Sequence, residues 1–169
     1  MNNQNGNRFP AWIIDAQSRV CSVTSSGQVT PRSDSNFAVD IGISEDGILW
    51  AVSNVPDPDG GGAKIYWGTG DGDWNEINTP EPGAVKITGA GGRGCLYLTQ
   101  GGAIWSMNTE SQGRLQNIAA DVIDIAFGES YLWATFPPTP GAAPVLQYGT
   151  FAQMPFQLQR NPLGFLTTY

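Results

Sequence analysis

A four-part pattern of short apolar runs recurs three times along this chain, and it restricts the fold more than any other feature. Each run alternates apolar and polar residues or is rich in aromatics, and each closes at Gly, Pro, Asn or Asp, as strands of antiparallel sheets do. In the first clear repeat the runs lie at residues 41–43, 49–52, 65–68 and 74–77. A repeat of about 40 residues with four strands has the period of a propeller blade.

The other repeats follow the same order. The second contains residues 85–87, 96–99, 104–106 and 115–118, and the third contains 123–125, 132–135, 146–149 and 156–158. A degenerate unit with three runs, 12–14, 20–23 and 28–30, precedes them. We therefore predict an all-β propeller of about four short four-stranded blades. The apolar run at 163–166, or a second chain, would complete the ring, because an open sheet edge invites aggregation.

The second runs of the four units define an alignment column. It contains Val20, Leu49, Leu96 and Leu132, at intervals of 29, 47 and 36 residues. Loops between blades vary in length while strands do not, so unequal intervals are compatible with the repeat. The longest interval contains a stretch rich in Pro, Asp and Gly at residues 55–62, which predicts a loop insertion.

Composition indicates one folded domain. We assign residues 9–169 to it and residues 1–8 to a polar N-terminal tail. Hydrophobic residues make up 40% of the chain, and the 22 Gly and 12 Pro fall between the apolar runs as turn residues. No stretch is long and apolar enough to be predicted as a membrane span, and the Asn-rich start lacks the features of a secretory signal. We expect a cytoplasmic protein, with release by a non-classical route left open.

Charge and residue content exclude several functions. The net charge is −7, from 15 acidic and 8 basic residues, which disfavours nucleic acid and anionic membranes as partners. The chain has no histidine, so Ser-His-Asp and Cys-His catalysis, histidine zinc sites and an imidazole pH switch are excluded. We expect no cofactor. Cys21 and Cys95 lie 74 residues apart without metal-ligand spacing, and we interpret both as core thiols.

The aromatic residues within the repeat carry a family resemblance. An Ile-rich strand is followed by Leu-Trp-Ala-Val at 49–52, an aromatic run at 65–68 and Trp-x-x-Ile at 74–77. This order resembles the tectonin family of β-propeller repeats over residues 12–160. The resemblance implies a propeller and, because the family includes lectins for glycans of microbial surfaces, sugar binding. Tectonin propellers usually have more blades than this chain can supply, so either a small ring or a ring shared by two chains is open.

The tryptophans divide into two groups. Those at 12, 50 and 133 lie on early strands and are predicted to pack between blades. The others lie on later strands or beside turns, where an indole can stack on the apolar face of a pyranose while nearby amides and carboxylates bind its hydroxyls. The predicted ligand-binding residues are Trp67, Asp71, Asp73, Trp74, Trp105 and Asn108.

We therefore expect a non-catalytic recognition module, with carbohydrate as the ligand. The alternative is a structural or adaptor protein whose propeller and tails bind a protein of a larger assembly, and self-association stays open. Asp40 and Asp124 at matching first-strand positions, with Glu76 on a fourth strand, raise glycoside hydrolysis, but nothing marks them as catalytic. The carboxylate pairs in the loops at 57–59 and 71–73 are interpreted as turn residues, with weak calcium binding left open.

Overall fold

The structure, a computed structural model, describes residues 11–32, 34–56, 62–77, 83–109, 116–119, 121–128, 131–138, 140, 143–150 and 159–160. These residues form antiparallel β-strands and contain no helix, which confirms the all-β prediction. Accordingly, the described part of the chain offers no helix with the length and apolar character that a membrane crossing requires.

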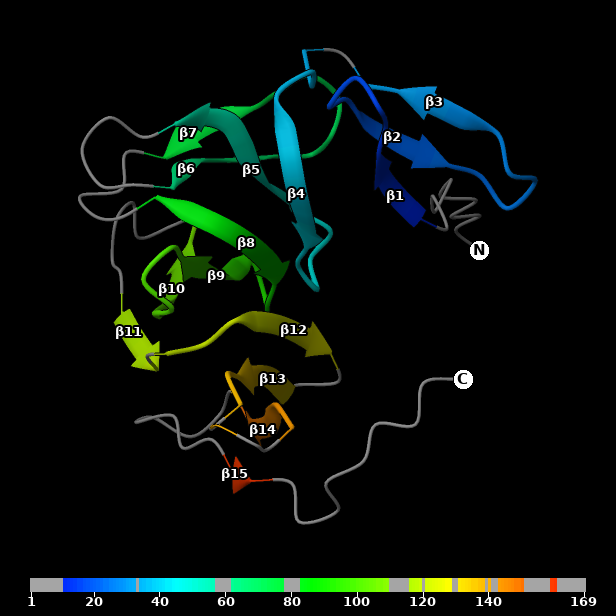
Figure 1. Cartoon of the computed structure of the whole chain (residues 1–169). Helices are drawn as coiled ribbons and strands as arrows, with labels where there is room; N and C mark the ends of the chain where they lie inside the picture. The colour runs from blue at the N-terminus through cyan, green and yellow to red at the C-terminus, as the bar shows by residue number, and fades with distance from the viewer. Residues whose placement is uncertain are drawn as a thin grey trace.

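The strands fall into four consecutive antiparallel units (Figure 1). Unit I contains β1 (Ala11–Ile14), β2 (Val20–Val23) and β3 (Val29–Pro31). Unit II contains β4 (Ala38–Ile43), β5 (Leu49–Pro56), β6 (Ala63–Gly68) and β7 (Asn75–Ile77). Unit III contains β8 (Ala84–Gly89), β9 (Gly94–Thr99), β10 (Ile104–Asn108) and β11 (Gln116–Ala119). Unit IV contains β12 (Asp124–Gly128), β13 (Tyr131–Phe136), β14 (Val145–Thr150) and β15 (Gln159–Arg160).

The units follow an arc with their first strands on the inner side. Strand β1 contacts β4, β4 contacts β8, and β8 contacts β12. Figure 1 shows these four strands on the concave side of the arc and β3, β7, β11 and β15 on its outer side. This order, from an inner first strand to an outer last strand, is the arrangement of propeller blades.

Strand pairing corrects one column of the predicted alignment. Leu49 pairs with the last residue of β4, Ile43, and its equivalent in unit III is Cys95, which pairs with the last residue of β8, Gly89. The predicted equivalent, Leu96, lies one position further and therefore on the opposite face of its sheet. The alignment was wrong there because the leucines were matched by residue type, which does not determine how a strand pairs with its neighbour.

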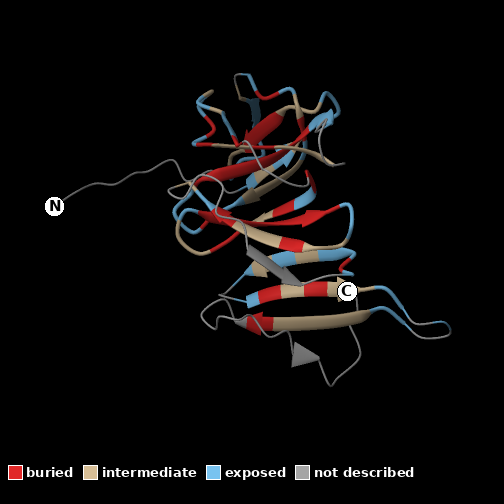
Figure 2. Ribbon diagram, turned by 90° about the vertical axis from the view of Figure 1, so that its left-hand side faces the viewer, coloured by how far each residue is buried: buried red, intermediate tan, exposed pale blue. Residues whose placement is uncertain are grey.

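Apolar clusters lie between successive units. Between units I and II, Val20 packs with Leu49 and Ala51. The cluster between units II and III is the largest and includes Trp50 and Tyr97, and the cluster between units III and IV includes the remaining core residues of β9 and β13. Figure 2 shows the buried positions on successive stacked sheets. Each sheet thus buries its faces against its neighbours, as the repeat predicted.

Units II and III are joined more closely than the other pairs. One pair of residues, Ala63 and Ala84, links β6 to β8, so the two units form one eight-stranded sheet. The first strands also approach at Gly42 and Gly89. A Cβ atom at Gly42 would collide with the backbone of β8, and one at Gly89 would collide with the carbonyl of Ile43. Glycine is required at this contact because no side chain fits between the two backbones.

Several sequence predictions fall outside the described residues. They are the N-terminal tail 1–8, the loop at 57–61, the strand at 156–158 and the closing segment 163–166. The number of blades and the closure of the ring therefore stay predictions. The degenerate first unit shows three strands, as predicted, among the residues that the structure describes.

Candidate functional site

A three-residue motif recurs where the first strands of units II, III and IV begin. The copies are Ala38-Val39-Asp40, Ala84-Val85-Lys86 and Val122-Ile123-Asp124. In each copy the first residue is buried, while the second is an aliphatic residue with an exposed fraction of 53%, 39% and 49% in turn. We call the exposed aliphatic residues and the charged residues that follow them the inner-strand row. Exposed aliphatic side chains at matching positions of three units do not contribute to the core, and their recurrence makes the row a candidate interaction site.

Bulges in the first strands explain why these aliphatic side chains are exposed. The register of β4 with β5 shifts between Ala38 and Asp40, and that of β8 with β9 shifts between Ala84 and Lys86. The extra residue turns its side chain away from the core, as bulges commonly do near functional sites. Ile123 directly precedes β12 and donates its N–H to the carbonyl of Thr135 at 2.8 Å.

The charged residues of the row connect adjacent units. Asp40 of β4 accepts a hydrogen bond at Oδ2 from the N–H of Ile87 on β8, at 2.8 Å. Burial raises the pKa of Asp40, although this hydrogen bond and the charge of Lys86 oppose the rise. Lys86 Nζ lies 2.7 Å from Asp124 Oδ1, and this hydrogen bond raises the pKa of the lysine. The row therefore combines apolar side chains with two carboxylates and one ammonium group.

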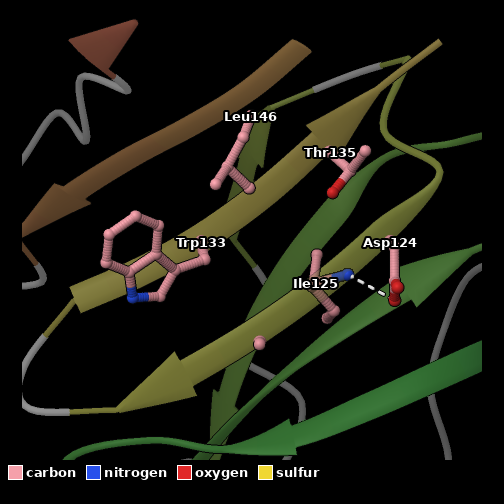
Figure 3. Close-up of a pocket in the computed structure, with 6 residues that line it drawn as sticks. Asp124, Ile125, Trp133, Thr135 and Leu146 are labelled. Atoms are coloured by element: carbon pink, nitrogen blue, oxygen red, sulfur yellow. Dashed lines mark hydrogen bonds between the residues drawn. The ribbon is translucent and has the colours of Figure 1, made fainter. Parts of the chain in front are cut away.

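Unit IV carries a hollow on the face that points away from unit III. The cavity measures about 300 Å³ and is lined by Asp124, Ile125, Ala126, Trp133, Thr135 and Leu146. Figure 3 shows Trp133 and Leu146 along one side of it and Asp124 near the opposite rim. The carboxylate of Asp124 accepts a hydrogen bond from the N–H of Ile125 at 2.9 Å. Asp124 thus belongs to both the row and the hollow.

The tryptophans predicted to bind ligand do not form one site. Trp67 and Trp105 are half-buried and pack on the cluster between units II and III, whereas Trp74 packs on the cluster between units I and II. Trp74 meets Phe37 edge to face, with ring centroids 5.3 Å apart. The guanidinium of Arg93 lies over the Trp67 ring at 5.9 Å. Trp67 and Trp74 therefore face opposite sides of unit II, although they lie close in sequence.

The predicted polar ligands lie on loops and strand ends. Asp71 is exposed and lies 3.5 Å from Arg32 of unit I, and Asn108 is exposed at the end of β10. Asp73 accepts hydrogen bonds from the N–H of Thr69 at 2.9 and 3.0 Å. Burial alone would raise the pKa of Asp73, but these hydrogen bonds outweigh it and leave the pKa lowered. Asp73 thus stabilises its own turn, as the turn interpretation expects.

The tryptophans and cysteines that the sequence assigns to packing differ in how far they are buried. Trp50 is fully buried, Trp12 is half-buried under the guanidinium of Arg32, and Trp133 is half-buried in the hollow of unit IV. Both cysteines are buried and unpaired. Burial raises the pKa of Cys21 and Cys95, so the thiols are in the unreactive protonated form, as predicted for core residues.

The inner-strand row was not identified from the sequence. The sequence pattern places Asp40 and Asp124 at matching first-strand positions, but it gives no sign that the residue before each charge is exposed. The signal that could have found it is the recurrence of an aliphatic residue before a charge and an isoleucine, at residues 39–41, 85–87 and 123–125.

Comparison with known proteins supports the fold alone. No family model and no curated protein matches this chain. Among solved structures, the chain is similar to YCF48, a β-propeller whose structure was determined bound to a D1 peptide. The TM-score is 0.55 at 15% sequence identity, and the match covers 87% of this chain and 50% of the other. The chain thus spans about half the length of that protein and has a propeller-type fold.

Proposed function

We propose that this chain is a non-catalytic recognition module that binds an extended polypeptide segment along the inner-strand row. The observation that carries the proposal is the exposure of Val39, Val85 and Ile123 at matching positions of three neighbouring units. A row of apolar contacts at regular spacing suits a segment whose alternate side chains point the same way. The similar structure bound to a D1 peptide is compatible with this class of ligand.

The charges of the row define the ligand further. Asp40 and Asp124 outnumber the single Lys86, and the whole chain carries a net charge of −7. Opposite charge favours association and selects the partner. We therefore expect the bound segment to combine aliphatic side chains with at least one Lys or Arg.

The proposal is tested by selecting peptides from a random display library on the immobilised chain. Selected peptides are expected to be aliphatic and basic and to bind Val85→Ser at least tenfold more weakly, because losing a buried aliphatic contact costs about 1.5 kcal/mol or more. The matched control is Val55→Ser. Val55 is 48% exposed on β5, outside the row.

Two results would contradict this function. One is a set of selected peptides whose affinity changes equally in the Val85 and Val55 variants. The other is turnover of a peptide or sugar that disappears with Asp40→Asn or Asp124→Asn, since it would make the site catalytic. The β-rich circular dichroism spectrum of each variant is compared with that of the wild type first.

Carbohydrate binding is a second proposal, and tectonin-type lectin character belongs to it. It is favoured by the exposure of Asp71 and Asn108, which follow the half-buried Trp67 and Trp105 closely in the sequence. A glycan array separates it from peptide binding. A lectin would give array signals that vanish in Trp67→Ala or Trp105→Ala and persist in Val85→Ser. Peptide recognition would give the reverse pattern.

A further inference from the structure

The two end units of the arc each expose a sheet face of a kind that the inner units bury against a neighbour. In unit IV, Leu132 and Ala134 pack toward unit III, so the alternate residues of β13 point away from it. The unit IV end face consists of Tyr131, Trp133, Leu146 and Tyr148. Its aromatic rings contact one another, with centroids of Trp133 and Tyr148 5.0 Å apart.

Unit I exposes a face of small apolar residues. Trp12, Ile14 and Val20 pack toward unit II, so the alternate residues of its strands point away. The unit I end face consists of Ala11, Ile13, Cys21, Val23, Val29 and Pro31. Ile13 is 39% exposed and Val29 is 49% exposed, whereas Cys21 between them is fully buried, with its Sγ 3.7 Å from Asp15 Oδ2.

The contact between units II and III shows what covers a face like that of unit IV. Trp50 pairs with Trp67 on adjacent strands, and Trp133 pairs with Tyr148 at the equivalent positions of unit IV. In unit II the aromatic pair packs against the sheet of unit III, and Trp50 is fully buried. Because a neighbouring unit covers the equivalent face of unit II, the occupant that fits the unit IV end face is another propeller unit.

The carboxylates of units II and IV differ in the same way as their aromatic residues do. Asp40 accepts a hydrogen bond from the N–H of Ile87, which belongs to the next unit along the arc. Asp124 occupies the equivalent position of unit IV, where its Oδ1 accepts a hydrogen bond from the N–H of its own neighbour, Ile125, and pairs with Lys86. A unit docked on the end face would bring a backbone N–H to Asp124 as β8 brings one to Asp40.

We propose that the covering unit is unit I of a second copy of this chain. Two copies would associate head to tail, with the unit IV end face of each on the unit I end face of the other, and form one ring of eight units about a two-fold axis. Both end faces of both copies are then covered, and bulky aromatics meet a face of small aliphatics. The match covers 50% of the similar propeller chain, which is compatible with two arcs in one ring. The inference does not depend on the proposed peptide site.

Head-to-tail contacts either close into a ring or continue as a filament, and we expect closure at two copies. The test is the native mass of the full chain by mass spectrometry and light scattering. We expect a single species of twice 18.0 kDa. A monomer at all concentrations, or an open series of larger species, would overturn the proposal.

Substitutions identify the contact. Trp133→Asp and Ile13→Asp are each expected to give monomers, because each alters both contacts of the ring and raises the dimer dissociation constant at least tenfold. Ile43→Asp is the control, since Ile43 is 48% exposed but lies on neither end face. The control variant is expected to remain a dimer. A dimer of the Ile13 variant would mean that two unit IV faces meet each other, which contradicts the head-to-tail arrangement.

Mixing the two monomeric variants gives the sharpest result. The unit I end face of the Trp133→Asp chain and the unit IV end face of the Ile13→Asp chain are both intact, so a mixed dimer retains one unaltered contact. Its appearance on mixing supports the proposal and also shows that both variants are folded. If the chain is a monomer whose peptide binding still requires Val85, the ring is wrong and the proposed function stands.

Discussion

The face of unit II that meets unit III and the outer face of unit IV carry nearly the same residues in different surroundings. The sequence Leu-Trp-Ala-Val of β5 becomes Leu-Trp-Ala-Thr in β13, and both tryptophans pair with an aromatic residue on the next strand. Trp50 is nonetheless fully buried, while Trp133 lines an open hollow. The difference lies in the neighbour, because the local sequence and the strand register are the same.

This comparison shows that burial in a repeat fold is a property of position along the array. Each unit has one face for the preceding unit and one for the following unit, so an end unit presents core-type residues to solvent. An aromatic residue that belongs to a core can therefore look like a ligand platform when its unit lies at an end. The reverse also holds, because Trp67 and Trp105 were interpreted as platforms and pack on a core cluster.

The largest expected effect separates the two tryptophans. Trp50→Ala should lower the free energy of unfolding by about 3–5 kcal/mol, because a large buried ring leaves a cavity. Trp133→Ala should lower it by about 1 kcal/mol or less, since its ring is already partly in solvent. Urea unfolding followed by tryptophan fluorescence measures both, in an Ile13→Asp background that prevents contact between copies. Equal losses would contradict the comparison.

A smaller effect is expected where the inner strands approach each other. Gly42→Ala should destabilise the fold by about 1–3 kcal/mol, because its Cβ would collide with the backbone of β8. The equivalent residue of the open face is Ala126, which pairs with Trp133 as Gly42 pairs with Trp50. Ala126→Gly is the matched control and should cost about 0.5–1 kcal/mol, the ordinary effect of glycine in a strand. Thermal unfolding by circular dichroism compares the pair.

The smallest expected effect is a pH dependence of the stability that Asp40 contributes at the contact between units II and III. Because the pKa of Asp40 is raised above 3.8 in the folded state, the folded chain binds this proton more tightly than the unfolded chain. Stability from this group is therefore lost as the pH rises from 3.8 through the raised pKa. Asp40→Asn keeps an acceptor for the N–H of Ile87 and removes the titration. The stability of the wild type relative to this variant should fall with rising pH in that range.

The control for this titration has the opposite sign. The hydrogen bond from the N–H of Arg19 is the main cause of the lowered pKa of Asp15, so the contribution of this carboxylate to stability is lost as the pH falls below 3.8. Relative to Asp15→Asn, the wild type should therefore gain stability with rising pH. A common slope for the two variants would show that the pH dependence does not arise at the contact between units II and III.

The sequence predicted the strand order well because period-two patterns and turn residues are local signals. The runs at 20–23 and 96–99 fall on observed strands, and the all-β architecture is as expected. The column that placed Leu96 beside Leu49 was wrong because only the pairing with β8 reveals that Cys95 lies opposite Gly89. A shift of one residue in a strand reverses the face, and residue type alone does not reveal such a shift.

The site was harder to predict for a physical reason. A valine that precedes a charged residue at the start of a strand looks like any other strand residue. Only the bulge in β4 and in β8 exposes Val39 and Val85, and a bulge depends on how the partner strand pairs. Trp67 and Trp74 likewise lie seven positions apart in the sequence but on opposite faces of unit II.

The single link between Ala63 and Ala84 has a consequence for the order in which the molecule loses its structure. Units II and III belong to one sheet through this pair, whereas units I and IV belong to separate sheets. Regions that share backbone hydrogen bonds tend to open together. The middle of the chain should therefore be the last part to melt.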